Sequence, residues 1–386
     1  MNKIRLGVIF GSRSVEHEVS IITAVQLMKH VDREKYDVVP IYVDKEGRWL
    51  SGPELEKIET YRNLTAVTNN DVYPLLASAD MITAKTLVSS NDAKASLGSI
   101  DVAIICCHGT LGEDGTIQGL LELAGIPYQG PGVLGSAVCM DKIITKKVLE
   151  ASNIPVVNFQ WLIKKEWIEN KVSVLDRLLN PENTGHKLLH FPLFVKPANL
   201  GSSVGITKAK DKKSLVDAIE VALHFDRRVL VEQGLEGMKE INISVLGFEE
   251  FQASVPEEPI ASGELLSYAD KYEGGGKKTG GMASLKRRIP APIPMSLTKK
   301  MQDAAIAAAR QCDVSGVVRI DFLANVGTGE FWLNELNTIP GSMSFYLWEA
   351  SGVPYQELIN RLVEIAFKRQ ADRQNNITSI ATTIIK

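Results

Sequence analysis

The sequence predicts a three-domain protein of the α/β and α+β classes whose first domain contains a parallel sheet. Its length of 386 residues indicates two or three domains, because single hydrophobic cores rarely grow beyond about 250–300 residues. Residues 3–107 alternate apolar runs with a stretch of helical periodicity, which is typical of a parallel α/β sheet. Pro131-Gly132 then marks a boundary, and the later strands flank helices and Gly-rich loops.

Composition narrows the class of protein. Apolar residues make up 45% and charged residues 23%, which is typical of a globular chain, and the net charge of −3 gives no signal for nucleic acid or membranes. The four cysteines lack the spacing of a zinc site or a disulfide framework. The apolar run at the N-terminus is too short for a signal peptide, and no run reaches the roughly 20 residues that span a bilayer. We therefore expect a cytoplasmic protein.

The N-terminal domain is expected over residues 1–131. Apolar runs at 3–10, 36–43 and 101–107 predict buried strands, and spaced apolar residues over 20–30 predict a helix. Residues 49–94 show little periodicity and are interpreted as helical insertions or loops. His17 is expected to face solvent and is given no role.

Two further domains are expected over 132–233 and 234–370. A helix should carry Met140, Ile143, Ile144 and Val148 on one face and end near 152–153. Further strands are predicted at 192–196, 229–232, 241–247, 251–257, 317–325 and 330–337, with helices at 214–224 and 298–312 and a closing helix through 358–365. The tail, 371–386, is a candidate for disorder.

The strands at 317–325 and 330–337 carry the most informative polar residues. Side chains alternate along a strand, so Arg319 and Asp321 share one face, as do Glu335 and Asn337. The short link VGTG predicts a hairpin that would bring the four groups together. Carboxylate and amide oxygens suit Mg²⁺, and an arginine would stabilise developing negative charge. The alternative is a solvated face with cross-strand ion pairs.

Residues 196–205 (KPANLGSSVG) follow a strand and could cradle phosphate. Their glycines permit close backbone approach and Ser202 and Ser203 can donate hydrogen bonds, although the motif lacks the ending of a Walker A loop. Lys142 and Lys196 could reach a polyphosphate, and either could equally be a surface lysine.

Five other features have a functional interpretation, and all of them except His108 also have a structural one. Glu232 ends a strand where backbone amides could meet an adenine, and Glu240 could take ribose hydroxyls, unless both are ordinary exposed glutamates. The Gly-rich segment 268–281 could be a mobile lid or a surface loop. His108 follows a strand at the edge where ligands usually bind in parallel sheets. Glu16 either binds a ligand or is simply a carboxylate that the dipole of the following helix favours at its N-terminus.

Seven motifs occur together in a fixed order: SVEHEVS, HGTLGEDGTIQG, PYQGPGVLGSAVCMDK, KPANLGSSVG, YADKY, RIDF and NELNTIPG. With them, residues 3–369 resemble the D-alanine–D-alanine ligases of the ATP-grasp superfamily. The resemblance implies an N-terminal pre-ATP-grasp domain followed by the two-domain ATP-grasp fold. It also implies synthesis of D-alanyl-D-alanine for peptidoglycan precursors from ATP and D-alanine, with two Mg²⁺ or Mn²⁺ ions, through a D-alanyl phosphate, in a homodimer.

The resemblance also assigns roles to residues. For the amino-acid substrates, Glu16 should hold the first ammonium through a network with Ser202 and Tyr272, and His108 should lie near the first carboxylate. Arg319 and the Gly341 amide should form the oxyanion site, and Tyr268 should line the substrate site. ATP contacts are implied for Lys142, Lys196, Ser203, Glu232, Glu240, Lys271 and Asn337, and metal binding for Asp321, Glu335 and Asn337.

The sequence departs from the family after Gly341, where the segment that usually binds the second substrate's carboxylate is several residues shorter. Ser344 is the candidate replacement, and Tyr272 favours a D-alanine acceptor over D-lactate. An ATP-grasp ligase with a different second substrate, such as D-serine or D-lactate, is the alternative. A nucleotide-binding module without catalysis is disfavoured because Arg319, Asp321, Glu335 and Asn337 are all present.

Overall fold

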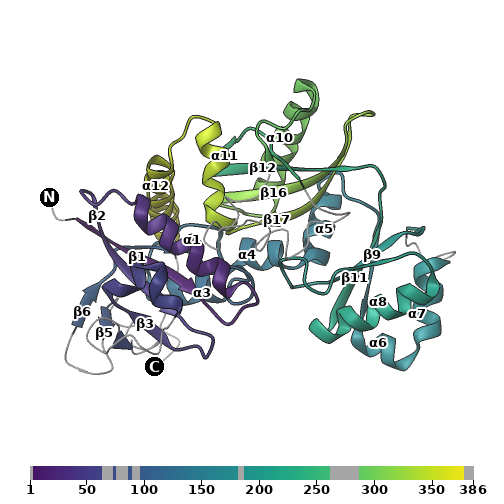
Figure 1. The fold of residues 1–386 in the computed structure, drawn as a ribbon, viewed down its shortest axis with the longest axis horizontal. Coiled ribbons are helices and arrows are strands. Elements are labelled where there is room, and N and C mark those ends of the chain that lie inside the picture. The colour runs from purple at the N-terminus through teal and green to yellow at the C-terminus, as the bar shows by residue number, and fades with distance from the viewer. Residues whose placement is uncertain are drawn as a thin grey trace.

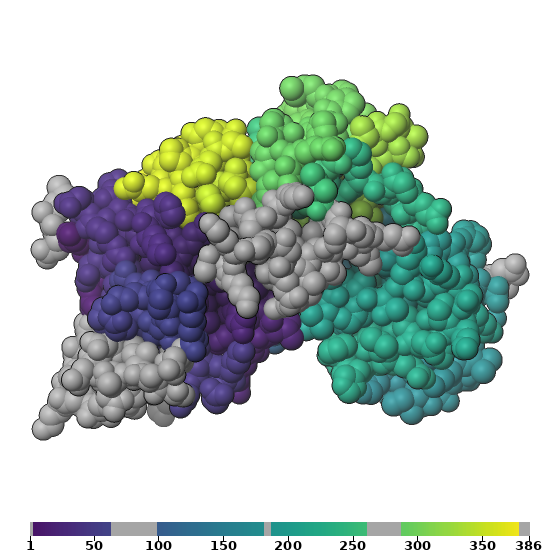
Figure 2. Space-filling view, in the orientation of Figure 1, coloured from purple at the N-terminus to yellow at the C-terminus, as the bar shows by residue number. Residues whose placement is uncertain are grey.

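The computed structural model describes residues 3–62, 73–74, 86–88, 96–180, 187–260 and 287–377. The predicted lid with Tyr268, Lys271 and Tyr272, and residues 378–386 of the predicted tail, lie outside these ranges. Figure 1 shows the N-terminal domain at one end, a small mixed subdomain at the other, and a C-terminal sheet between them. The space-filling view in Figure 2 shows the N-terminal domain and the small subdomain with a gap between their lower parts. Within the described residues, no helix combines the length and apolar character needed to cross a membrane.

The N-terminal sheet has the order β4-β3-β2-β1-β7. Its centre is parallel as predicted, with β1 (Ile4–Gly11) between β2 (Tyr36–Val43) and β7 (Val102–Ile105). These strands are continuous apolar runs because helices such as α1 (His17–His30) and α3 (Thr116–Ala124) accompany a sheet that is buried on both faces.

The interpretation of residues 49–94 as helical or irregular was partly wrong. This segment begins with β3 (Trp49–Ser51), which pairs antiparallel with β2, and also contains β4 (Tyr73–Pro74) and β5 (Thr86–Val88), the last paired with β6 (Ser96–Ser99). Strands of two or three residues are too short to show alternation in a sequence. The 3-10 helices η1 (Pro53–Glu56) and η2 (Ile58–Arg62) account for the rest of its described structure.

His17 does not face solvent, so that prediction was wrong. Its side chain is 4% exposed, and its Nδ1 lies 2.6 Å from the Ser12 carbonyl oxygen. Its Nε2 lies 2.9 Å from the Tyr42 hydroxyl. Both ring nitrogens thus have hydrogen-bond partners inside the domain, which offsets the cost of burying a polar ring.

The predicted helix through Met140 is two helices, α4 (Val133–Met140) and α5 (Lys142–Ala151). Asp141 separates them in an extended conformation, and its Oδ1 accepts hydrogen bonds from the amides of Ile143 and Ile144 at 3.0 Å each. An aspartate at this position satisfies the first amides of the next helix, so the helix starts anew there. Met140 therefore does not share a helical face with Ile143 and Ile144.

The small subdomain is an antiparallel sheet of order β10-β9-β11-β8. Its strands are β8 (Phe159–Ile163), β9 (Leu193–Pro197), β10 (Thr207–Ala209) and β11 (Arg228–Gln233), and its helices are α6 (Lys164–Glu169), α7 (Lys171–Leu179) and α8 (Lys212–Phe225). The apolar face of α8, including Leu215, Ile219 and Ala222, packs in one core with β9 and β11. This sheet carries Lys196 and Glu232.

The C-terminal sheet has the order β13-β12-β16-β17 and is antiparallel. Its strands are β12 (Lys239–Phe248), β13 (Glu250–Ala253), β16 (Gly316–Asn325) and β17 (Glu330–Asn337), with α10 (Met295–Gln311) in the same core. The strand predicted at 251–257 ends at Ala253, and β14 (Glu258–Pro259) pairs instead with β15 (Arg287–Arg288).

The chain returns to the N-terminal domain through η5 (Gly341–Ser344), α11 (Phe345–Ala350) and α12 (Tyr355–Gln374). Leu358, Leu362 and Ile365 of α12 share a core with α1 and the parallel strands. α12 extends four residues into the predicted tail, to Gln374. The sheet that carries the polar hairpin is thereby fixed against the N-terminal domain.

Candidate active site

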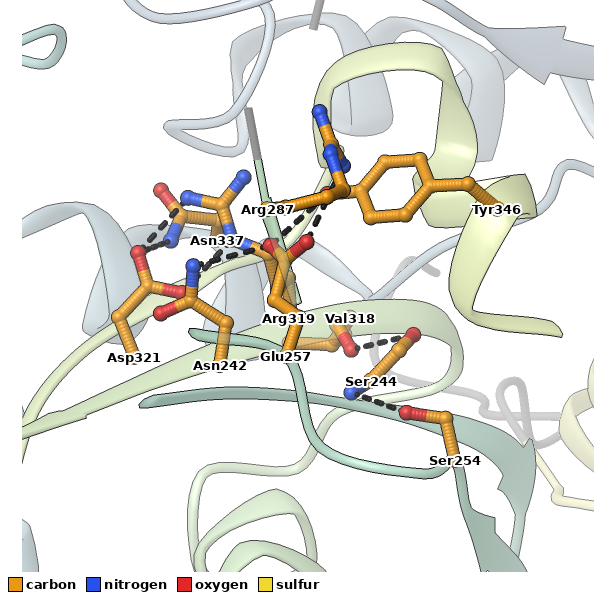
Figure 3. Close-up of polar contacts among 10 residues, drawn as sticks. All are labelled: Asn242, Ser244, Ser254, Glu257, Arg287, Val318, Arg319, Asp321, Asn337 and Tyr346. Atoms are coloured by element: carbon orange, nitrogen blue, oxygen red, sulfur yellow. Dashed lines mark hydrogen bonds and ion pairs between the residues drawn. The ribbon is translucent and has the colours of Figure 1, made fainter. Parts of the chain in front are cut away.

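The hairpin of β16 and β17 forms as the sequence predicts. Arg319 pairs in register with Asn337, and Asp321 with Glu335. The Nε and Nη2 atoms of Arg319 donate to the two carboxylate oxygens of Asp321, each at 2.7 Å, and the Asn337 amide donates to Asp321 at 3.1 Å. Figure 3 shows these side chains converging. Arg319 is 6% exposed. Burial tends to lower the pKa of its guanidinium, but the charge and hydrogen bonds of Asp321 have the larger effect, so the pKa is raised.

A β-bulge gives this hairpin a residue that sequence reasoning missed. The register shifts after Asp321, so that Phe322 pairs with Leu333 and Asn334 is the extra residue of β17. The Asn334 side-chain oxygen accepts a hydrogen bond from Lys196 Nζ at 3.1 Å. The bulge thus joins the hairpin to Lys196, in the loop predicted to cradle phosphate, and alternation alone gives no signal for it.

A second polar group lies beside Arg319 and was also missed. Glu257 is 1% exposed and accepts hydrogen bonds from Asn242, Tyr346 and Arg287, each at 3.1 Å. The Arg287 guanidinium lies 3.8 Å above the centre of the Tyr346 ring. Figure 3 shows this cluster joining β12, the start of β15 and α11. These residues are far apart in the sequence, and no local motif links them.

Glu232 lies between two lysines inside the molecule. Its carboxylate contacts Lys146 Nζ at 2.6 Å and forms a second ion pair with Lys196. Burial opposes ionisation of Glu232, but the two ammonium groups outweigh it and hold its pKa at about 2. Lys146 is 1% exposed, and burial lowers its pKa; the charge of Glu232 opposes that shift, and the charge of Lys196 adds to it. Lys146 was missed, although it lies one helical turn after Lys142.

The loop at 196–205 meets the start of α1. Lys142 Nζ donates to the Leu200 carbonyl oxygen at 2.7 Å, and the Ser202 hydroxyl donates to Glu16 Oε1. A Cβ atom on Gly109 or on Gly201 would come within 2.5 Å of Glu16 Oε2. Glycine at these two positions therefore leaves room for the Glu16 carboxylate.

Glu113 and His108 connect the N-terminal domain to the end of β17. Glu113 accepts hydrogen bonds from the amides of Gly109 and Ile339, both at 2.8 Å. Burial, together with the charge of Glu16, raises the pKa of Glu113 to about 8. His108 contacts the Ile339 carbonyl oxygen at 2.7 Å through Nδ1 and the Thr23 hydroxyl at 2.8 Å through Nε2. Burial lowers the pKa of His108 to about 4, so the ring is neutral. Glu113 is a further residue missed from the sequence, although it follows His108 closely.

The predicted residues line two cavities that share one wall. The first is lined by predicted substrate residues, among them Glu16, His108, Arg319 and Gly341. The second is lined by predicted nucleotide and metal residues, among them Lys196, Ser203, Glu232, Glu240 and Asp321. Lys142, Gly201, Ser202 and Glu335 line both. Ser344 is the last residue of the turn that begins at Gly341; it is fully buried and is not among the described residues of either wall.

The hard oxygen atoms of this site are those of Asp321, Glu335 and the Asn337 amide. Within the described ranges, no three His, Cys, Asp or Glu side chains gather as a metal-binding group. Asp321 and Glu335 are direct cross-strand partners, and like charges in that position destabilise a sheet unless cations offset them. The donor set thus fits a hard divalent cation.

Comparison with known proteins settles the family. Residues 5–131 match the family model described as D-ala D-ala ligase N-terminus, and residues 148–364 match D-ala D-ala ligase C-terminus. The chain belongs to the D-alanine–D-alanine ligase family. The family and the ATP-grasp fold expected from the seven motifs are therefore confirmed.

Relatives in this ligase family align along nearly the whole chain. The D-alanine–D-alanine ligase of Natranaerobius thermophilus is 37% identical over 99% of this chain and 100% of its own, and that of Caldicellulosiruptor bescii is 40% identical over 97% and 98%. Among solved structures, the ligase from Coxiella burnetii has a TM-score of 0.80 at 31% identity, covering 97% of each chain. The VanG D-Ala:D-Ser ligase from Enterococcus faecalis has a TM-score of 0.79 at 29% identity, covering 95% and 100%.

Proposed function

We propose that this chain joins two D-alanine molecules into D-alanyl-D-alanine while converting ATP to ADP and phosphate, as a cytoplasmic step toward peptidoglycan. The observation that carries the proposal is the wall shared by the two cavities. A nucleotide on one side and an amino acid on the other would meet at Lys142, Ser202 and Glu335. Such an arrangement suits transfer of a phosphoryl group from ATP to a carboxylate.

The first step is formation of the acyl phosphate. A carboxylate oxygen of the first D-alanine attacks the γ-phosphorus, and ADP leaves. Glu16, held by Ser202, would bind the ammonium of this D-alanine. Lys142 and Lys196 would neutralise phosphate oxygens, with Lys196 held by Glu232 and Asn334. Phosphoryl transfer needs mainly such positioning and charge neutralisation.

The metal assignment belongs to the same proposal. Asp321, Glu335 and Asn337 would hold two Mg²⁺ or Mn²⁺ ions, which when bound neutralise the phosphates. Glu240 and the backbone beside Glu232 would take the ribose and adenine, and both residues line the second cavity. A relative from Bacillus anthracis has been solved in complex with ATP, at 25% identity and a TM-score of 0.66.

In the second step, the amine of the second D-alanine attacks the acyl carbon and phosphate leaves. Negative charge develops on the acyl oxygen, and Arg319 with the Gly341 amide would stabilise it. The acyl phosphate must be shielded from water, and we assign this to the lid with Tyr268, Lys271 and Tyr272, which lies outside the described residues.

A ligase with the same donor and a different acceptor is the alternative. Two observations favour it: the short turn after Gly341, and the likeness to a D-Ala:D-Ser ligase. ADP release with D-alanine alone, and with D-alanine plus D-serine, D-lactate or L-alanine, tests both functions when products are identified by mass. D-Alanyl-D-alanine as the main product supports the proposal, and a mixed product as the main one supports the alternative. If ATP is not turned over with any of these acceptors, both functions are contradicted.

We further propose that the chain acts as a homodimer, in line with the resemblance to its family. The molar mass in solution, measured by light scattering, tests this. A monomer at micromolar concentration with full activity would contradict it.

A further inference from the structure

We propose that Thr23 and His108 are positioning residues that hold the turn carrying the Gly341 amide and thereby set the oxyanion site. This inference rests on the proposed ligation, because Gly341 is assigned to that site there. Neither residue is assigned to chemistry in this inference. Both act through the backbone of residues 339–342.

A chain of three hydrogen bonds runs from Ile339 through His108 and Thr23 to Ser342, and their directions follow from the groups involved. A carbonyl oxygen only accepts, so His108 Nδ1 donates to Ile339 at 2.7 Å. In the neutral ring, Nε2 then carries a lone pair and accepts from the Thr23 hydroxyl at 2.8 Å. The Thr23 oxygen in turn accepts from the amide of Ser342 at 3.1 Å.

These bonds hold the chain on both sides of Gly341. Ile339 is fixed twice, because its amide donates to Glu113 at 2.8 Å while its carbonyl accepts from His108. Ser342 is fixed by Thr23 on the other side. Gly341 lies between them and lines the first cavity. The direction of its N–H is thus determined by residues of α1 and of the loop after β7.

The backbone of the turn needs such support. Ser342, Met343 and Ser344 have φ angles of 53°, 53° and 49°, which is the left-handed region that residues other than glycine rarely adopt. Three consecutive residues in this conformation persist only where surrounding contacts impose it. The bond from Thr23 to the first of them is one such contact, and its loss should let the turn relax.

The burial of Thr23 and His108 indicates that their polar atoms contact the turn and not a bound substrate. Thr23 is 1% exposed and is not among the residues that line the first cavity. His108 lines that cavity but is 3% exposed, and both of its ring nitrogens are engaged with protein atoms. The ring therefore presents carbon atoms to the cavity, while its polar atoms orient the turn.

The test replaces the Thr23 hydroxyl and leaves the substrate contacts intact. Thr23→Val keeps the shape of the side chain and removes both of its hydrogen bonds, whereas Thr23→Ser keeps the hydroxyl. Ser20→Ala is the matched control, because Ser20 is a buried hydroxyl of the same helix that bonds Gly11 and Cys106 and not the turn. His108→Asn is a second variant, since its amide can still donate to Ile339 but leaves Thr23 without its acceptor.

Two readouts separate positioning from general damage. Thr23→Val should lower kcat about tenfold or more, toward the loss caused by removing one oxyanion donor, while the KM values for ATP and the first D-alanine stay within twofold. It should also weaken binding of a phosphinate dipeptide analogue, whose tetrahedral phosphorus mimics the attacked carbon. Amide exchange of the peptide covering 338–344 should speed up in Thr23→Val and His108→Asn, and remain unchanged in Thr23→Ser and Ser20→Ala.

The outcomes are decisive in each direction. The proposal is overturned if exchange over 338–344 is unchanged in both Thr23→Val and His108→Asn, or if Ser20→Ala lowers kcat as much as Thr23→Val. Should Thr23→Val fail to fold, the amide exchange of His108→Asn against that of Ser20→Ala gives the same comparison. Amide exchange is measured without substrate, so it tests the positioning even if the parent protein makes no dipeptide, an outcome that would instead refute the proposed function.

Discussion

Replacing Glu232 by glutamine should destabilise the protein and weaken its use of ATP. Glutamine has nearly the same shape, so the substitution removes a charge without creating a cavity. In the parent, one carboxylate is shared by the ammonium groups of Lys146 and Lys196. Without that charge, two cations face each other in the interior, and Lys146, at 1% exposure, should lose its proton.

The magnitude follows from the pKa of Glu232. A pKa of about 2, against the ordinary 4.5, corresponds to about 3 kcal/mol of stabilisation. Burial lowers the pKa of Lys146 and offsets part of this, so we expect a net loss of about 2–3 kcal/mol. A depressed carboxyl pKa contributes stability above about pH 4.5, and that stability is lost as the pH falls through about 2. This carboxylate contribution is therefore the same at pH 8 and at pH 5, but folding of the variant releases the Lys146 proton, so its deficit should be larger at pH 5 than at pH 8.

Guanidinium unfolding followed by tryptophan fluorescence at these two pH values measures the deficit. Glu250→Gln is the matched control, because Glu250 is exposed on β13 and the same chemical change should leave stability unaltered. The KM for ATP should rise about tenfold in Glu232→Gln, because Lys196 loses the charge that positions it. A free energy of unfolding within about 0.5 kcal/mol of the parent would show that the ion pairs contribute little, and the reasoning would be wrong.

Three further substitutions test the rest of the site. Arg319→Ala should lower turnover about a hundredfold or more, as loss of an oxyanion donor does, and steady-state kinetics within a few-fold of the parent would contradict the assignment. Glu16→Gln should raise the KM for the first D-alanine and leave that for ATP nearly unchanged; a loss of ATP binding, measured by calorimetry, would place Glu16 in the wrong subsite. Glu113 has a pKa raised to about 8, so its contribution to stability is full below about pH 4.5 and is lost as pH rises through 8. Unfolding at pH 6 and pH 9 should therefore show a smaller decline in Glu113→Gln than in the parent, and an equal decline would refute the shift.

The hairpin shows what a sequence can predict about this site. The period of two in β16 and β17 and the short link between them set which residues share a face, and Asp321 lies opposite Glu335 as that pattern requires. The central strands of the parallel sheet were equally readable, because burial on both faces leaves continuous apolar runs. Such features depend on residues close together in the chain.

The site residues that could not be predicted from the sequence are brought together by packing between distant segments. Glu257, Arg287 and Tyr346 come from three separate segments of the chain, and nothing local indicates that they meet. Lys146 was not singled out, because only the packing of α5 against β11 places it beside Glu232. The break between α4 and α5 could have been found, since an aspartate before a new apolar period is a helix-start signal.

The central claim is that the γ-phosphoryl group of ATP is transferred to the carboxylate of the first D-alanine where the two cavities meet. D-Alanine labelled with ¹⁸O in both carboxylate oxygens tests this directly, with mass analysis of the phosphate released in the presence of ATP. The account predicts one ¹⁸O atom in each phosphate for every dipeptide formed, because the acyl phosphate passes its bridging oxygen to the leaving group. Phosphate without label, released together with dipeptide, would contradict the acyl-phosphate route.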